Sequence, residues 1–263
     1  MDFARARQVF EEYLNGYDRE DDKVRLKIVH TYCVVDCAEE IARRMGLSEE
    51  DRELAGIIGL LHDIGRFEQL KRFDSFAPDT MDHAAYGAEI LFGSQNMIRR
   101  FLDDDRFDDV IKTAIACHSS FELGEIPDRR TLLHARLIRD ADKLDNCRVK
   151  LEEPLEVLLG VSADEAGKGL VSPRVWQACM DRRSVLSSDR VTSVDYWISY
   201  IAQYYDVNFP ETLSIIKEKN YIQKMVERVR YKDADTAEKM KTLLVEMNDY
   251  ISAKTDGQKC DML

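Results

Sequence analysis

The sequence predicts an all-α fold. Apolar residues recur at helical spacing along almost all of the 263 residues, and residues typical of helix ends separate the apolar segments. The chain contains only 12 Gly and 5 Pro, with 44% apolar and 33% charged residues, which is the composition of a folded helical protein. No segment shows the clean apolar and polar alternation of a half-buried strand.

Three helices are predicted in the first part of the chain. Gly16 and Gly46 stand where the first two end, because glycine adopts the left-handed conformation that terminates a helix. Ser48 is placed to cap the third, since its hydroxyl can accept from the first backbone amides. The predicted ranges are about residues 2–15, 20–45 and a third from Ser48 through Leu61, His62 and Asp63, ending at Gly65.

A loop that could border a site is predicted at residues 66–81, which have mixed charge, a proline and no sustained period. Asp82 then caps a short helix that runs to about Phe92. Further helices are predicted near residues 105–119 and 130–150.

Residues 151–263 are predicted to form a further helical portion that packs as one unit on a helical core of residues 1–150. Pro173 and Pro210 suit the first turns of two helices, because a proline there loses no helical hydrogen bond. The aromatic residues of this portion include Trp197, Tyr200, Tyr204 and Tyr205. They are expected to pack in the core or at a dimer interface rather than to stack on bases. The sequence does not decide whether the protein forms a homodimer.

The net charge of −12 argues against binding to extended nucleic acid or to an anionic membrane surface, since the average surface repels phosphate groups. No apolar run reaches the length of a membrane span, and the first residues do not read as a secretory signal. We therefore expect a cytoplasmic protein. Its six cysteines form no CxxC pair and are expected to be reduced, buried thiols.

Several histidines and carboxylates fall on the apolar faces of different predicted helices. Each lies one helical turn from an apolar residue of the same helix, so its side chain is expected to point inward. A single inward histidine is usually a hydrogen-bonded core residue, but several on separate helices favour a shared cation, because burying unpaired ions is costly. These residues are His30, His62, His118 and Asp142.

Two segments carry a resemblance to a known family. "LLHDIGR" at residues 60–66 and "RDADKLD" at residues 139–145, with His30 upstream, resemble the HD-domain superfamily of metal-dependent phosphohydrolases. The resemblance covers about residues 25–150 and implies an HD-domain helical bundle. It also implies a first metal with four ligands, namely His30, His62, Asp63 and Asp142.

Two further segments resemble the HD subgroups that bind two metals. "DHAAYGAEIL" begins at Asp82 and "IACHSS" at Ile115, and they imply that His83 and His118 hold a second metal, with Asp63 as the bridge. The sequence departs from the HD-GYP branch, because Ser119 follows His118 and no GYP signature is present. Asp140 is the rival to Asp142 as a ligand, and His134 has no counterpart in the pattern, so we expect it at the surface or behind a ligand.

The resemblance implies a hydrolase whose substrate is a small anionic phosphate ester, such as a nucleotide. A hydroxide between two cations would attack phosphorus, and basic residues would complete the charge clamp. We assign catalytic roles to Asp63, Arg66 and Lys143, with Lys71 or Arg72 as further candidates and Asp145 behind the ligands or orienting a water. The cofactors expected are one or two divalent transition metals, namely Fe, Mn, Ni, Co or Zn, with Mg as an alternative at one site.

Two alternatives use the same residues. Some HD-fold proteins hold two irons and activate oxygen, and a nitrogen and oxygen ligand set suits Fe and Mn equally. In the other alternative, the metal site serves a ligand-binding module without turnover. The sequence leaves both open.

Overall fold

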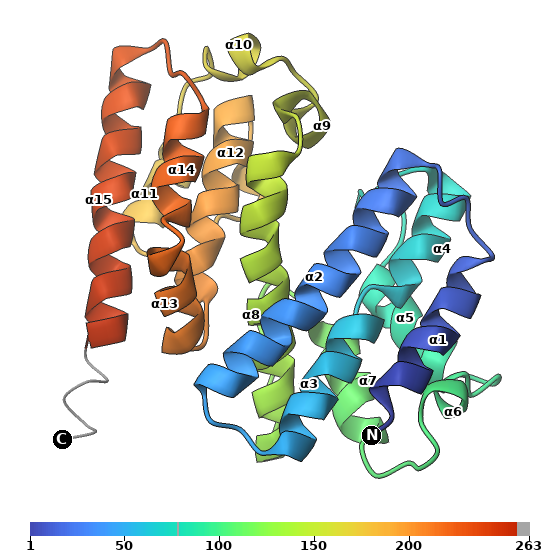
Figure 1. The fold of residues 1–263 in the computed structure, drawn as a ribbon. Helices are drawn as coiled ribbons and strands as arrows, with labels where there is room; N and C mark the ends of the chain where they lie inside the picture. The colour runs from blue at the N-terminus through green and yellow to red at the C-terminus, as the bar shows by residue number, and fades with distance from the viewer. Residues whose placement is uncertain (78, 257–263) are drawn as a thin grey trace. The chain divides into compact units, whose positions relative to one another are not determined.

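A computed structural model describes residues 1–77 and 79–256. The described chain is helical and contains no strand, so the predicted all-α class is confirmed (Figure 1). Contacts divide it into two compact units, Met1–Asp145 and Asn146–Leu263. None of the helices in the described ranges combines the length and apolar character needed to cross a bilayer.

Unit 1 contains the helices that position the histidines. α2 packs along α3, α4 along α5, and α5 along α7, while α1 lies against α3 and α6. Their bounds are α1 Phe3–Leu14, α2 Asp22–Arg44, α3 Glu49–Leu61, α4 Ile64–Phe73, α5 His83–Phe92, α6 Ile98–Phe101 and α7 Asp108–Cys117, followed by α8 Arg129–Glu152, which crosses the boundary between the units.

Several predicted helix starts are confirmed by hydrogen bonds. The Ser48 side chain accepts from the backbone amide of Asp51 at the start of α3. The Asp82 carboxylate accepts from the amides of Ala84 and Ala85, which fixes His83 as the first residue of α5. The Asp82 cap therefore fixes the start of α5 and, with it, the position of the ligand candidate His83.

The prediction that Gly65 ends the third helix is wrong. α3 ends at Leu61, the chain turns at His62 and Asp63, and α4 includes Gly65. α4 runs to Phe73, so residues 66–73 of the predicted loop at 66–81 are helical. Gly65 serves tertiary packing instead, because a Cβ there would overlap the His83 carbonyl oxygen and lie 2.7 Å from the Gly87 amide nitrogen. The missing side chain lets α4 and α5 pack closely.

Unit 2 is a second helical cluster in which α15 packs against α11, α13 and α14. Its aromatic core includes Trp197, fully buried with its indole N–H donating to the Met225 carbonyl at 3.1 Å, and the fully buried Tyr204. Pro173 and Pro210 begin α11 and α13, as predicted. The bounds are α9 Leu155–Leu159, α10 Ala163–Ala166, α11 Pro173–Met180, α12 Ser193–Ala202, α13 Pro210–Glu218, α14 Tyr221–Arg228 and α15 Ala234–Asp256, with short 3₁₀ helices η1 Ser187–Asp189 and η2 Gln203–Asp206.

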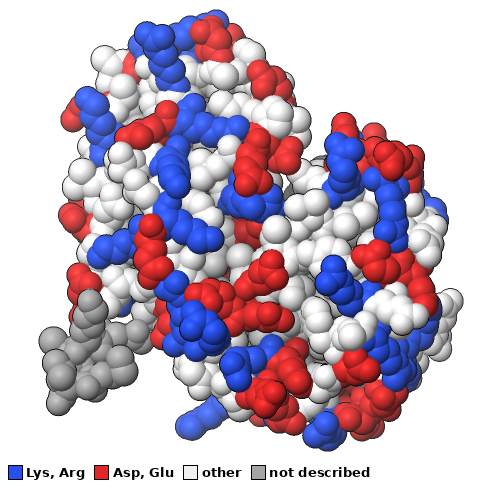
Figure 2. Space-filling view, viewed as in Figure 1, with Lys and Arg blue, Asp and Glu red and all other residues white. Residues whose placement is uncertain are grey.

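Acidic and basic side chains are interspersed on the face that Figure 2 shows. The cysteines of the described residues form no disulfide; Cys147 and Cys179 are buried, as predicted, whereas Cys33, Cys37 and Cys117 are partly exposed. Cys260 lies outside the described residues.

Candidate metal centre

The six side chains predicted as metal ligands come from α2, α5, α8, the end of α7 and the turn between α3 and α4. His30 lies within α2, His62 and Asp63 form the turn between α3 and α4, and His83 begins α5. His118 follows the last residue of α7. The four histidines and Asp63 are buried.

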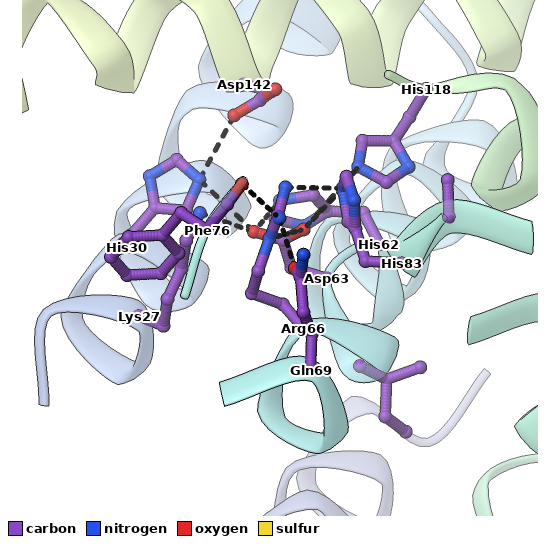
Figure 3. Close-up of polar contacts among 12 residues, drawn as sticks. Lys27, His30, His62, Asp63, Arg66, Gln69, Phe76, His83, His118 and Asp142 are labelled. Atoms are coloured by element: carbon purple, nitrogen blue, oxygen red, sulfur yellow. Dashed lines mark hydrogen bonds and ion pairs between the residues drawn. The ribbon is translucent and has the colours of Figure 1, made fainter. Parts of the chain in front are cut away.

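Asp63 lies at the centre of two histidine pairs (Figure 3). Its Oδ2 is 3.9 Å from Nε2 of His30 and 3.6 Å from Nε2 of His62. Its Oδ1 is 3.3 Å from Nε2 of His83 and 3.5 Å from Nε2 of His118. The two sets of three residues could each hold a metal ion, and Asp63 belongs to both. A carboxylate that turns one oxygen to each set has the geometry of a bridge between two cations.

Asp142 lies beside the His30 side of the centre. Its Oδ1 is 3.0 Å from Nε2 of His30, and its side chain keeps about a quarter of its exposure. It is not part of either three-residue set. The structure thus brings Asp142 to the first pair of histidines, with His30 between it and Asp63.

Hydrogen bonds on the outer nitrogens orient three of the imidazole rings. Nδ1 of His62 lies 2.7 Å from the Gly59 carbonyl oxygen, and Nδ1 of His118 lies 2.7 Å from that of Ile115. Both carbonyls can only accept, so each Nδ1 carries the proton and Nε2 presents its lone pair to Asp63. Nδ1 of His30 is held by Asp145 Oδ2 at 2.7 Å, so Asp145 stands behind a ligand candidate.

One of these inward nitrogens lacks a hydrogen-bond partner. Nε2 of His62 is buried and makes no hydrogen bond, whereas Nε2 of His30 lies 3.0 Å from Asp142 Oδ1. Buried polar atoms are nearly always satisfied, and convergent lone pairs of imidazole and carboxylate are what a transition metal would satisfy. The residues present therefore fit a divalent metal.

Three of the ligand candidates, His62, His83 and Asp63, are held in the protonation states that bind metals. Burial lowers the pKa of His62 to about 4 and that of His83 to about 2, so both imidazoles are neutral near pH 7. Burial alone would raise the pKa of Asp63, but nearby charges, of which Lys27 contributes most, outweigh it and hold that pKa well below its ordinary value. Neutral imidazole and ionised carboxylate are the metal-binding forms. His30 differs: burial would lower its pKa, but hydrogen bonds with Asp142 and Asp145 outweigh burial and raise that pKa.

Two cations flank Asp63, and sequence reasoning missed one of them. Lys27 Nζ lies 2.6 Å from Oδ2, while Arg66 Nε lies 3.7 Å from Oδ1. Arg66 was predicted for this place, and its guanidinium also lies 2.8 Å from His83 Nε2. Lys27 precedes His30 by three residues on α2. That spacing puts both side chains on one helix face and was the available signal.

The other basic candidates have different partners. Lys71 donates to the Gly16 carbonyl oxygen, and Arg72 pairs with Glu68 and donates to the Tyr86 hydroxyl. The structure therefore does not bring these two residues to Asp63. Lys143, which follows Asp142 on α8, is partly buried, and its catalytic role stays a prediction.

His134 belongs to a separate cluster. It is buried, and its Nε2 lies 3.1 Å from Asp51 Oδ1, which also accepts from Arg130. His134 was expected at the surface or behind a ligand, and the surface alternative is wrong, because the side chain is buried next to Asp51 of α3 and Arg130 of α8. Asp140, the rival ligand, is fully buried and is not part of either candidate metal set.

Comparison with known proteins gives one match. Residues 28–147 match the family model described as HD domain. The matched range includes all six candidate ligands together with Arg66 and Lys143, and it begins one residue after Lys27. Searches of the curated proteins and of the solved structures found no match.

Proposed function

Because residues 28–147 of this chain form an HD domain, we propose that the protein is a metal-dependent phosphohydrolase that acts on small phosphate esters, a class that includes nucleotides. One observation carries the proposal: each oxygen of Asp63 faces a different pair of histidines. That arrangement suits two metals at one bridging carboxylate. Fe, Mn, Ni, Co and Zn all accept such nitrogen and oxygen ligands.

The side chains would have different roles in such a centre, as metal ligands or as groups that orient the ligands. His30, His62 and Asp63, joined by Asp142, would hold one cation, and Asp63, His83 and His118 the other. Bound metals would polarise the phosphoryl group and let a water ionise near neutral pH. Asp145 fixes the ring of His30, and the carbonyls of Gly59 and Ile115 fix those of His62 and His118.

Lys27 and Arg66 supply the positive charge that a phosphate ester needs next to this centre. Their side chains are mostly buried, with 15% and 13% exposure, and both face Asp63. A cation that is shielded from water interacts more strongly with a phosphoryl oxygen than a solvated one does. We propose that both bind the non-bridging oxygens of the substrate and stabilise the charge that grows as the ester bond breaks.

The test compares the native protein with Asp63→Ala after anaerobic purification. We expect the native protein to contain transition metal and to hydrolyse members of a phosphate-ester panel when Mn, Fe, Ni or Co is supplied. Asp63→Ala is expected to lose both metal and activity. Asp109→Asn, at an exposed position of α7, is the matched control and is expected to keep both.

Other outcomes would favour the alternatives. Iron-dependent oxygen uptake without ester hydrolysis would replace the phosphohydrolase with an oxygenase, whose ligand set would be the same. Full metal retention in Asp63→Ala would show that Asp63 is not the bridge. A metal-loaded protein without either activity would favour a ligand-binding module.

A further inference from the structure

An aromatic ring lies at the edge of the metal centre. Phe76 follows α4 and retains 36% of its exposure, whereas Phe67 of α4 is fully buried. The centroid of the Phe76 ring lies 5.8 Å from Lys27 Nζ and 5.9 Å from Arg66 Cζ (Figure 3). The ring thus borders the same two cations that flank Asp63.

The backbone around Phe76 is tied to Arg66 through a buried amide. Gln69 is fully buried, and its Oε1 accepts from the Arg66 guanidinium. Its Nε2 donates to the Ala77 carbonyl oxygen at 2.9 Å and to Thr80 Oγ1 at 2.8 Å. Arg66 also donates to the carbonyl oxygen of Phe76 at 3.4 Å. The position of the ring is therefore coupled to the cation that we assign to the phosphate.

An exposed ring next to two cations suits a ligand with two chemically different ends. The cations would hold a phosphate, and the ring would contact the group esterified to it. Contacts between aromatic rings add to affinity beyond the apolar area that they bury. A polyhydroxy alcohol would instead lose hydrogen bonds to water against the ring and gain little.

We propose that Phe76 is a specificity-determining residue, which selects phosphate esters whose alcohol part carries a planar ring near the ester oxygen. This inference rests on the proposed phosphohydrolase function and names the substrate class of the same site. Lys27 and Arg66 bind the phosphate end, and Phe76 contacts the ring end.

The experiment measures kcat/KM of the metal-loaded protein for phenyl phosphate and glycerol 3-phosphate. Phe76→Leu keeps an apolar side chain but removes the ring, and Phe76→Trp keeps a ring. We expect Phe76→Leu to lower the preference for phenyl phosphate about three- to tenfold, and Phe76→Trp to retain it. Phe73→Leu, at an exposed phenylalanine at the end of α4, is the matched control and is expected to leave the preference unchanged.

Binding gives a readout that does not depend on turnover. Calorimetry compares phenylphosphonate with methylphosphonate on the metal-loaded protein, and we expect phenylphosphonate to bind more tightly and to lose this advantage in Phe76→Leu. An equal loss for both ligands would overturn the inference, because Phe76 would then act only by packing on Lys27 and Arg66.

The inference and the proposed function fail in different ways. If both esters are hydrolysed and the Phe76 substitutions leave their ratio unchanged, the phosphohydrolase stands and the role of Phe76 is wrong. If the native protein hydrolyses no ester and binds no phosphonate, both are wrong.

Discussion

Lys27 and Asp63 form a largely buried ion pair at the centre of the candidate site, with 2.6 Å between Nζ and Oδ2. The ammonium group is the first of the charges that hold the pKa of Asp63 low against the effect of burial. Lys27 lies on α2 and Asp63 between α3 and α4, so the packing of α2 against α3 and α4 creates the pair. One cation thus contacts the carboxylate that we propose as the bridge.

Replacement of Lys27 by methionine separates its effect on substrate from its effect on metal. We expect kcat/KM for phosphate esters to fall about 100-fold, because a shielded positive charge is lost from the phosphoryl site. Metal content is expected to persist, since the ligand atoms remain. Metal analysis and steady-state kinetics check both points.

Lys23→Met is the control for this variant. Lys23 lies one turn earlier on α2 and pairs with Asp74 at the surface. We expect it to leave kcat/KM within about twofold of the native value, because an exposed ion pair contributes little. Loss of metal together with activity in Lys27→Met would mean that the lysine only supports Asp63.

Gly65→Ala is expected to destabilise unit 1, because its Cβ would collide with the His83 carbonyl at the contact of α4 and α5. Overpacking of this kind costs about 1–3 kcal/mol in the free energy of unfolding. It should also weaken metal binding, since His83 would move relative to Asp63. Urea unfolding and metal titration measure the two effects.

Gly124→Ala serves as the comparison, because a Cβ at Gly124 would meet no atom within 4 Å. We expect its unfolding midpoint to match that of the native protein. Native-like stability and metal affinity in Gly65→Ala would contradict the tight contact between α4 and α5.

The Asp51 and His134 cluster predicts a loss of stability in acid. Burial lowers the pKa of His134, although Asp51 opposes the shift. Burial would raise the pKa of Asp51, but hydrogen bonds from Ser48, His134 and Arg130 lower it. Below pH 6.5 the unfolded chain therefore takes up a proton at His134 that the folded protein resists, so the free energy of unfolding falls. Below the ordinary pKa of 3.8, Asp51 contributes in the same direction.

His134→Gln removes the first of these titrations. We expect the dependence of unfolding free energy on pH to become shallower just below pH 6.5, as measured by urea unfolding at several pH values. Lys112→Gln, on α7, is the control and should keep the native slope. A parallel shift of the whole curve in His134→Gln, without a change of slope, would mean that His134 does not titrate there.

Local sequence signals were sufficient for many of the elements. Ser48 and Asp82 form their caps with amides only two or three residues away, and Pro173 and Pro210 act within one turn. Such contacts involve residues that are close together in the sequence, so a local sequence pattern can predict them. Helical phase also directed His30 and His62 inward, and both are buried.

The remaining features depend on contacts between segments far apart in the chain. A glycine such as Gly65 is typical of a helix end. Its role in packing depends instead on the close approach of His83 and Gly87 on α5. In the sequence, Lys27 is one of several charged residues on α2. Its contact with Asp63, 36 residues later, depends on the packing of the helices. The sequence by itself determined most of the helices, because periodicity and capping act within a few residues, and its resemblance to the HD superfamily supplied the full set of ligand candidates. The tertiary structure alone decided which charges and rings meet at Asp63, because the packing of separate helices sets those distances.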